Sequence, residues 1–197
     1  FVRTRDGLKT PNIQLYFSPV SYSHELPGRR AMLKPDSFSA VLLGVSNCKS
    51  NSRGQIRIKN NNPLEAPIIE PNYLSHQGDV QDLLEGVKLL RKLAQTKSFS
   101  EVIYDEFRPG PDCKSDAELT EDIKENAWTV FHPSSTCRMG SDPLKNVVDS
   151  SLKVHGIKGL RIADASIFPE LVSGNINAAT IMVGEKASDL ILEDIKS

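Results

Sequence analysis

The first seventy residues alternate between short apolar runs and polar breaks, a pattern typical of β-strands. Strands are predicted at residues 13–17, 39–45 and 55–59, with a short extended piece at 67–71. The run at 55–59 alternates strictly, so Ile56 and Ile58 are expected to point inward. These runs follow one another without helices between them, which favours an antiparallel sheet.

Helices are predicted where apolar residues recur at helical spacing, over residues 80–96, 115–127 and about 177–195. Asp79 is placed to cap the first of them. Ser115 and Glu118 form a capping-box pattern at the start of the second. The chain is therefore expected to be an α+β protein, in which helices flank an antiparallel sheet.

Beyond Pro133 the sequence pattern changes. Short β-like runs separated by glycine turns occur at residues 147–149, 152–156 and 160–164. Asp164 ends the last of these runs, a loop follows at 169–174, and the final helix comes next. A strand ending in Asp, then a loop, then a helix N-terminus is a layout typical of ligand sites in α/β proteins.

Composition argues against several classes of function. The chain has 197 residues, 39% of them hydrophobic and 25% charged, and its formal net charge is -1. That balance gives no electrostatic reason to expect a nucleic acid as partner, and no apolar run approaches the roughly 18 residues of a membrane span. The three cysteines and four histidines (His24, His76, His132 and His155) lie far apart, so no metal site is expected.

His132 is the first candidate for chemistry. It lies between Phe131 and Pro133, and the residue before a proline is disfavoured in the α region. We therefore expect His132 on a fixed, exposed turn, where a histidine can act as a base near neutral pH. A packed or merely solvated histidine is the alternative.

Two further candidates lie near the last helix. Asn175 and Asn177 flank its start, and they either cap it or, with the unpaired N–H groups of its first turn, bind an oxygen that carries partial negative charge. Asp164 is either a solvated carboxylate at a strand end or a ligand for a sugar or polyol hydroxyl.

The conjunction of these candidates is more specific than any one of them. In order, the chain reads H-P-x-x-T-x-x-M-G from His132, V-V-D from Val147, G-L-R-I-x-D-A-S-I-x-P from Gly159, G-N-x-N-A-x-T-I-M from Gly174 and E-K-A-x-D-L-I from Glu185. Upstream stand S-R-G-x-I-R-I from Ser52, N-P from Asn62 and P-x-I-x-P-N-Y-L from Pro67. This series resembles the C-terminal part of the glucose–methanol–choline (GMC) family of FAD-dependent oxidoreductases. It is closest in style to the animal glucose-dehydrogenase and choline-dehydrogenase-like branches.

The resemblance implies a fold and a missing partner. Residues 1–143 would form a portion of the substrate-binding domain, and residues 144–197 a strand–loop–helix segment that completes an FAD-binding Rossmann-like domain. The G-x-G-x-x-G fingerprint of that domain is absent, and the chain begins at Phe1 without a signal peptide. We therefore expect a missing N-terminal FAD-binding portion of the same protein. The family branch favours a secreted or extracellular location.

The resemblance also implies an activity, the oxidation of a small-molecule alcohol. Family members remove the hydroxyl proton and pass the carbinol hydride to N5 of FAD. His132 matches the family's base, and Asn175 matches a second catalytic position, where an amide can stabilise a developing alkoxide. The residues matched to cofactor binding are Phe131, Asp164, Ala165, Asn175, Ile176 and Asn177.

Two departures and two alternatives accompany this interpretation. Ser135 stands where the family commonly has Gly, and Ala179 where it often has Pro.

Some members of the superfamily are hydroxynitrile lyases, which keep FAD for structure and use the matching histidine for acid–base work on cyanohydrins. The other alternative is a non-catalytic binding remnant, against which the presence of both His132 and Asn175 counts.

Overall fold

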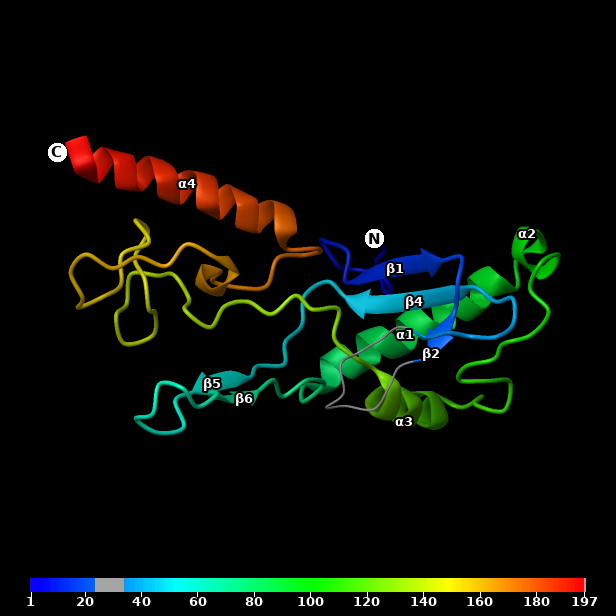
Figure 1. The fold of residues 1–197 in the computed structure, drawn as a ribbon. Helices are drawn as coiled ribbons and strands as arrows, with labels where there is room; N and C mark the ends of the chain where they lie inside the picture. The colour runs from blue at the N-terminus through cyan, green and yellow to red at the C-terminus, as the bar shows by residue number, and fades with distance from the viewer. Residues whose placement is uncertain (24–33, 197) are drawn as a thin grey trace. The chain divides into compact units, whose positions relative to one another are not determined.

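The computed structural model describes residues 1–23 and 34–196, so His24 lies outside the described residues. The helices agree with the sequence pattern, since all three predicted helices form within a few residues of their expected bounds. In chain order the elements are β1 (Ile13–Ser18), β2 (Tyr22–Ser23), β3 (Lys34–Pro35), β4 (Leu42–Asn47), β5 (Gln55–Arg57), β6 (Ile68–Glu70), α1 (Gln77–Ala94), α2 (Lys97–Ser100), α3 (Asp116–Asn126), the 3-10 turn η1 (Ala165–Ile167) and α4 (Asn177–Lys196) (Figure 1).

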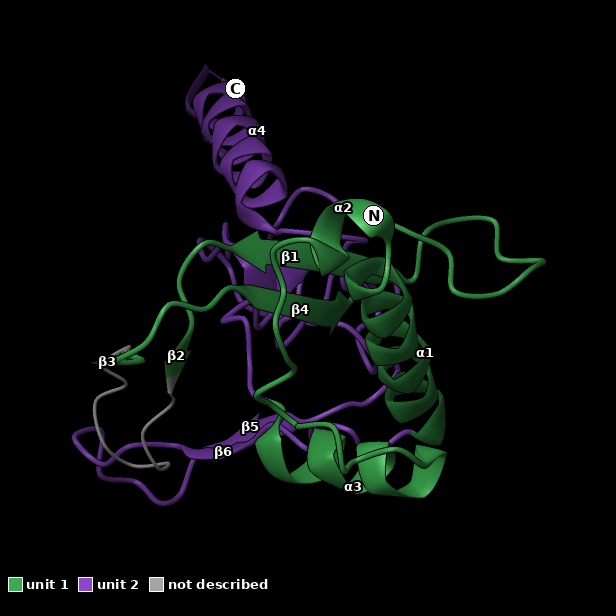
Figure 2. Ribbon diagram, turned by 90° about the vertical axis from the view of Figure 1, so that its right-hand side faces the viewer, with its two compact units in different colours: residues 1–47, 77–127 green, residues 48–76, 128–197 purple. Residues whose placement is uncertain are grey.

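The chain divides into two compact units, each built from two separate stretches (Figure 2). Unit 1 comprises Phe1–Asn47 and Gln77–Ala127, and unit 2 comprises Cys48–His76 and Trp128–Ser197. This division differs from the domain boundary between residues 143 and 144 that the family resemblance implied. That boundary refers to the domains of a longer enzyme, and it stays a prediction.

The expected antiparallel sheet is replaced by three small ribbons. Within residues 1–23 and 34–196 the strands pair as β1–β4, β2–β3 and β5–β6, all antiparallel and each two-stranded. An alternating pattern predicts that a strand forms but not which strand it pairs with, and the ribbons β1–β4 and β5–β6 belong to different units. The α+β class is thus confirmed, whereas the prediction of one continuous sheet is wrong.

In unit 1, α1 packs on the β1–β4 ribbon and on α3. The contact with the ribbon is close, because a β-carbon at Gly86 would lie 3.1 Å from Cγ1 of Val45 and 3.5 Å from Cδ1 of Ile13. Asp79 does not precede α1 as its predicted cap. It lies in the first turn, because α1 begins at Gln77, three residues earlier than the apolar periodicity indicated, and its side chain is fully buried.

In unit 2, a second hydrophobic core joins the region after Pro133 to α4. Its buried members are Val148, Leu152, Ile167, Phe168, Val183 and Ala187. The β-like runs expected at 147–149, 152–156 and 160–164 meet only through single bridges, such as Val148 with Val154 and Lys153 with Arg161. This core fixes one face of α4 against η1 and the preceding turns.

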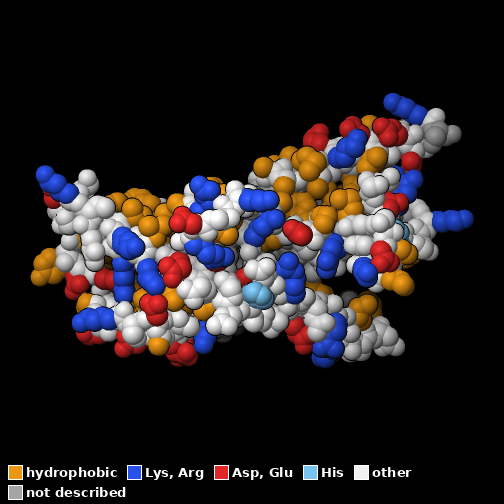
Figure 3. All heavy atoms as spheres, turned by 180° about the vertical axis from the view of Figure 1, so that it is seen from behind, with side chains coloured by type: hydrophobic (Ala, Val, Ile, Leu, Met, Phe, Trp, Pro, Cys, Tyr) orange, Lys and Arg blue, Asp and Glu red, His pale blue; other side chains and the backbone are white. Residues whose placement is uncertain are grey.

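The other face of α4 is apolar as well. Ile181 and Met182 are 58% exposed, and Leu192 and Ile195 are also exposed. Figure 3 shows hydrophobic side chains at the surface in several patches between charged side chains. Within the described ranges, no helix is long and apolar enough to span a lipid bilayer.

Two helical glycines allow the packing of α1 to be tested. Replacing Gly86 by Val should lower the free energy of unfolding by about 1–3 kcal/mol, because the new methyl groups must displace Val45 and Ile13. Gly184 in α4 has open space around it. Gly184→Ala should therefore raise the free energy of unfolding by about 0.5–1 kcal/mol through helix propensity. Urea denaturation of the two variants measures both changes, and equal behaviour would contradict the close contact at Gly86.

Candidate functional site

His132 lies on an irregular segment whose backbone is held in unusual conformations. Phe131 has φ +60° and Ser135 has φ +70°, both in the left-handed region that favours glycine. The N–H of Phe131 donates to Oγ1 of Thr129 at 3.0 Å. The φ of Ser135 gives a physical reason for the glycine that the family commonly has at this position, since glycine adopts this conformation without steric cost.

Three backbone hydrogen bonds tie this segment to η1. The N–H groups of Ser135, Cys137 and Met139 donate to the carbonyls of residues 165, 166 and 167 in turn, at 3.2, 2.9 and 2.8 Å. Because Ile167 belongs to the buried core of unit 2, these bonds attach the turn that carries His132 to that core.

Asp164 directly precedes η1 and caps it. Its Oδ1 accepts from the N–H of Ser166 at 2.7 Å. The second carboxylate oxygen has no hydrogen-bond partner among the described residues, so it remains available to a hydroxyl group of a ligand. A capping role and a ligand role are therefore compatible at this residue.

The start of α4 places Asn175 away from the capping position. The helix begins at Asn177, so the capping position falls to Ile176, whose side chain has no hydrogen-bonding atom. The carbonyl of Ile176 accepts from both the N–H and the hydroxyl of Thr180, each at 2.9 Å. Asn175 instead faces His132, and its Oδ1 lies 3.0 Å from Nε2 of that histidine.

The far end of α4 is held by charge. The carboxylate of Asp194 accepts from Nζ of Lys153 and from a guanidinium nitrogen of Arg161, both at 2.8 Å. These two hydrogen bonds lower the pKa of Asp194 below its ordinary value, and the bond from Lys153 has the larger effect. The helix is thereby joined to the turns before η1 at one end and carries the Asn175 loop at the other.

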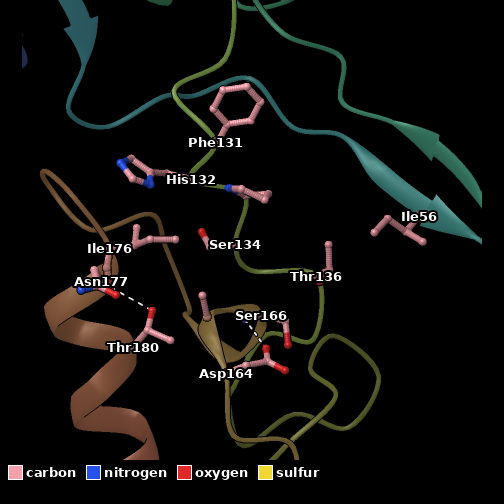
Figure 4. A pocket seen from close by; sticks show the side chains of 12 residues that line it. Ile56, Phe131, His132, Ser134, Thr136, Asp164, Ser166, Ile176, Asn177 and Thr180 are labelled. Atoms are coloured by element: carbon pink, nitrogen blue, oxygen red, sulfur yellow. Dashed lines mark hydrogen bonds between the residues drawn. The ribbon is translucent and has the colours of Figure 1, made fainter. Parts of the chain in front are cut away.

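These elements surround an open cavity of about 540 Å³ (Figure 4). It is lined by Ile56, Phe131, His132, Pro133, Ser134, Thr136, Asp164, Ala165, Ser166, Ile176, Asn177 and Thr180. Six of the seven predicted site residues therefore line one cavity, and the seventh, Asn175, contacts it through His132. Residues more than thirty positions apart in the sequence are thus brought together within unit 2.

Several lining residues were absent from the predicted site. Ser134, Thr136, Ser166 and Thr180 stand within the motifs, but nothing in their spacing marked them as lining residues. Ile56 and Ile58 were expected to point inward, and this expectation is wrong, because they are 52% and 88% exposed. The strict alternation at residues 55–59 marks an apolar face, and of its two isoleucines Ile56 lines the cavity.

The described residues contain no group of three His, Cys, Asp or Glu side chains arranged to hold a metal ion. Burial raises the pKa of the Cys48 thiol, the one fully buried cysteine of the described chain. A thiol in that state is a poor nucleophile and a poor metal ligand. The polar side chains that line the cavity carry imidazole, amide, carboxylate and hydroxyl groups.

Solved structures with the same fold include two oxidases. Pyridoxine 4-oxidase from Mesorbium loti matches with a TM-score of 0.81 and 26% identity, over 96% of this chain and 36% of its own. A formate oxidase variant from Aspergillus oryzae RIB40, studied for the effect of mutation on FAD modification, matches with a TM-score of 0.82 and 27% identity. That match covers 96% of this chain and 33% of the oxidase.

Sequence comparison agrees with the structural match. Oxygen-dependent choline dehydrogenase from Escherichia coli O139:H28 (strain E24377A / ETEC) is 39% identical over 191 residues, which is 97% of this chain and 33% of the dehydrogenase. The chain thus spans about a third of the length of this relative. The model of the GMC oxidoreductase family matches residues 50–184. The resemblance carried by the motifs is confirmed, and the chain belongs to the GMC oxidoreductase family.

Proposed function

We propose that this chain is the C-terminal part of an FAD-dependent oxidoreductase that acts on the CH–OH group of an alcohol. The observation that carries the proposal is the contact between His132 Nε2 and Asn175 Oδ1, 3.0 Å apart at the edge of the cavity. The family membership supports an oxidoreductase, and the names of the relatives support FAD as its cofactor.

In this proposal His132 is the base. A substrate hydroxyl beside Nε2 loses its proton to that nitrogen, and the ring becomes an imidazolium. The imidazolium N–H can then donate to Oδ1 of Asn175 over the observed 3.0 Å. The amide oxygen of Asn175 is thus within hydrogen-bond reach of the nitrogen that receives the proton as the alcohol is oxidised.

Asn175 has a second use. An amide offers one acceptor and two N–H donors, so while Oδ1 faces His132 the NH₂ group remains able to donate to the substrate oxygen. As that oxygen gains alkoxide character, the donated bond becomes stronger. One side chain therefore stabilises both products of the proton transfer.

The cavity fits the cofactor in size and in chemistry. A volume of about 540 Å³ lies within the range of small-molecule and cofactor sites. Asp164 and Ala165 would contact the polyol part of FAD, and Asn177 would lie against its ring system. The other residues matched to cofactor binding are Phe131, Asn175 and Ile176. When bound, FAD would supply the acceptor for the carbinol hydride at N5. The N-terminus of α4 offers unpaired N–H groups and a positive dipole end to negative charge on the ring.

Choline is the first alcohol to test, because relatives 39% identical to this chain are named choline dehydrogenases. The direct test is anaerobic addition of the alcohol to the longer FAD-loaded protein. Loss of the oxidised flavin spectrum supports the proposal. An oxidised flavin that persists with a panel of alcohols, while a cyanohydrin is cleaved, would replace the proposal by the hydroxynitrile-lyase alternative.

The 197-residue chain expressed alone should contain no tightly bound FAD. It lacks the G-x-G-x-x-G turn that binds the pyrophosphate, and it spans about a third of its relatives. Visible absorbance of the purified chain, after incubation with FAD and gel filtration, measures this. Stoichiometric flavin on the chain would contradict the idea that an N-terminal portion is required.

His132→Ala should lower kcat/KM for the alcohol by roughly 10²–10⁴-fold, the usual range for the loss of a general base. The FAD content of the longer protein should stay the same. His76→Ala is the matched control, because His76 is an exposed histidine of the same unit that does not line the cavity. Activity of the His132 variant within a few-fold of the parent would show that His132 is structural.

Asn175→Asp should slow flavin reduction strongly while leaving thermal stability nearly unchanged. The carboxylate cannot donate to the developing alkoxide and repels its negative charge. Ile176, not Asn175, occupies the capping position, so helix stability should not depend on this side chain. Asn175→His should retain some activity, since it restores a donor. Anaerobic stopped-flow and thermal melts distinguish the two roles, and an Asp variant as fast as the parent would leave Asn175 without a catalytic part.

A further inference from the structure

The ribbon β5–β6 presents an exposed apolar face. Ile56 pairs directly with Ile69 across the ribbon, so both side chains project from the same face. They are 52% and 62% exposed, and Ile58, two residues beyond Ile56, is 88% exposed. Only Ile56 among these three lines the cavity that contains His132 (Figure 4).

The backbone of the ribbon holds Ile56 in place. A β-carbon at Gly54 would lie 2.2 Å from the carbonyl oxygen of Glu70, so the approach of the two strands requires glycine there. On the opposite face Arg57 pairs with the carboxylate of Glu70 at 3.0 Å. The amide of Asn72 donates to the carbonyl of Arg53 at 2.9 Å. Ile56 is therefore carried by a fixed strand and not by a loose loop.

A second apolar side chain faces the same cavity. Phe131, next to His132, lines the cavity and is 63% exposed. Its ring meets that of Trp128 edge-on, with centroids 5.5 Å apart and an interplanar angle of 77°. An edge-to-face contact of this kind is a favourable arrangement of two aromatic rings. Ile56 and Phe131 are thus two exposed apolar side chains that line the same cavity as His132, the proposed proton acceptor.

The charges around the cavity narrow the class of substrate. Among the described residues that line it, the ionisable side chains are His132 and Asp164, and no Lys or Arg is present. An anionic substrate would face a carboxylate without a cation to pair with, which is unfavourable in a partly desolvated site. A substituent with an apolar surface, by contrast, can cover Ile56 and Phe131.

We propose that Ile56 is a specificity-determining residue, which packs against a non-anionic, apolar-surfaced substituent of the alcohol substrate. This inference rests on the proposed function. It assigns the contact to the strand β5, which lies more than seventy residues before His132 in the sequence.

Two alcohols of the same shape test the contact. Choline carries three methyl groups on a cationic nitrogen, and 3,3-dimethyl-1-butanol carries the same three methyl groups on carbon. In the longer FAD-loaded protein, Ile56→Ala should lower kcat/KM for 3,3-dimethyl-1-butanol about tenfold, since several buried methyl contacts are lost. Ile56→Glu should raise the ratio of kcat/KM for choline to that for 3,3-dimethyl-1-butanol about tenfold or more, because the new carboxylate attracts only the cation.

Ile58 supplies the matched controls. It lies on the same run of chain and is more exposed, but it does not line the cavity. Ile58→Ala and Ile58→Glu should leave both kcat/KM and the ratio within about twofold of the parent. Each ratio is measured in one enzyme preparation, so it does not depend on the fraction of protein that is folded.

The outcomes separate the two claims. If the parent protein oxidises alcohols and the Ile56 and Ile58 variants give the same ratio, Ile56 does not contact the substrate and the inference is wrong, while the proposed function stands. If no alcohol reduces the flavin of the parent, the proposed function fails and the inference fails with it. A ratio that changes only with Ile56 supports both.

Discussion

Three backbone hydrogen bonds between residues 135–139 and η1 are the constraint on which the site depends. They attach an irregular segment, with two residues in the left-handed region, to a turn whose Ile167 is buried in the core of unit 2. A histidine on a free loop would sample many positions and lose the benefit of a fixed geometry. Here the backbone, and not the histidine's own contacts, determines where His132 lies.

Asn175 is positioned beside His132 by a different element, α4. Val183 and Ala187 fix one face of α4 in the same core, and Asp194 joins the far end of the helix to Lys153 and Arg161. The loop that enters α4 then places Asn175 next to His132. The segments that carry His132 and Asn175 are thus both attached to one hydrophobic core. This explains how two residues 43 positions apart maintain a 3.0 Å contact.

The sequence predicted the parts of this arrangement that depend on local patterns. The helices follow apolar periodicity, and the capping box at Ser115 and Glu118 forms as expected. Strand pairing depends on non-local partners, so the single sheet expected from the alternating runs is instead three ribbons. Ile56 shows a related limit: alternation identifies an apolar face, but only the fold determines whether that face meets a core or a cavity.

At the site, the motifs identified the residues but not their contacts. Asn175 was compatible with a helix cap until the start of α4 at Asn177 assigned that position to Ile176. Ser135 was a departure from the family pattern, and its φ of +70° shows the steric reason for the usual glycine. These are properties of backbone conformation, which residue identities alone do not determine.

The central claim is that His132 and Asn175 act on one substrate hydroxyl as a pair, and a double-mutant cycle tests it most directly. The rate of anaerobic flavin reduction is measured in the longer FAD-loaded protein, for the unsubstituted protein, for His132→Ala, for Asn175→Ala and for the double variant. We expect the effects of the two substitutions on the rate of flavin reduction to be strongly non-additive. The double variant should be about as slow as the slower single variant, because either change removes the function of the pair. Rate reductions that multiply would show that the two residues act independently and would contradict the account.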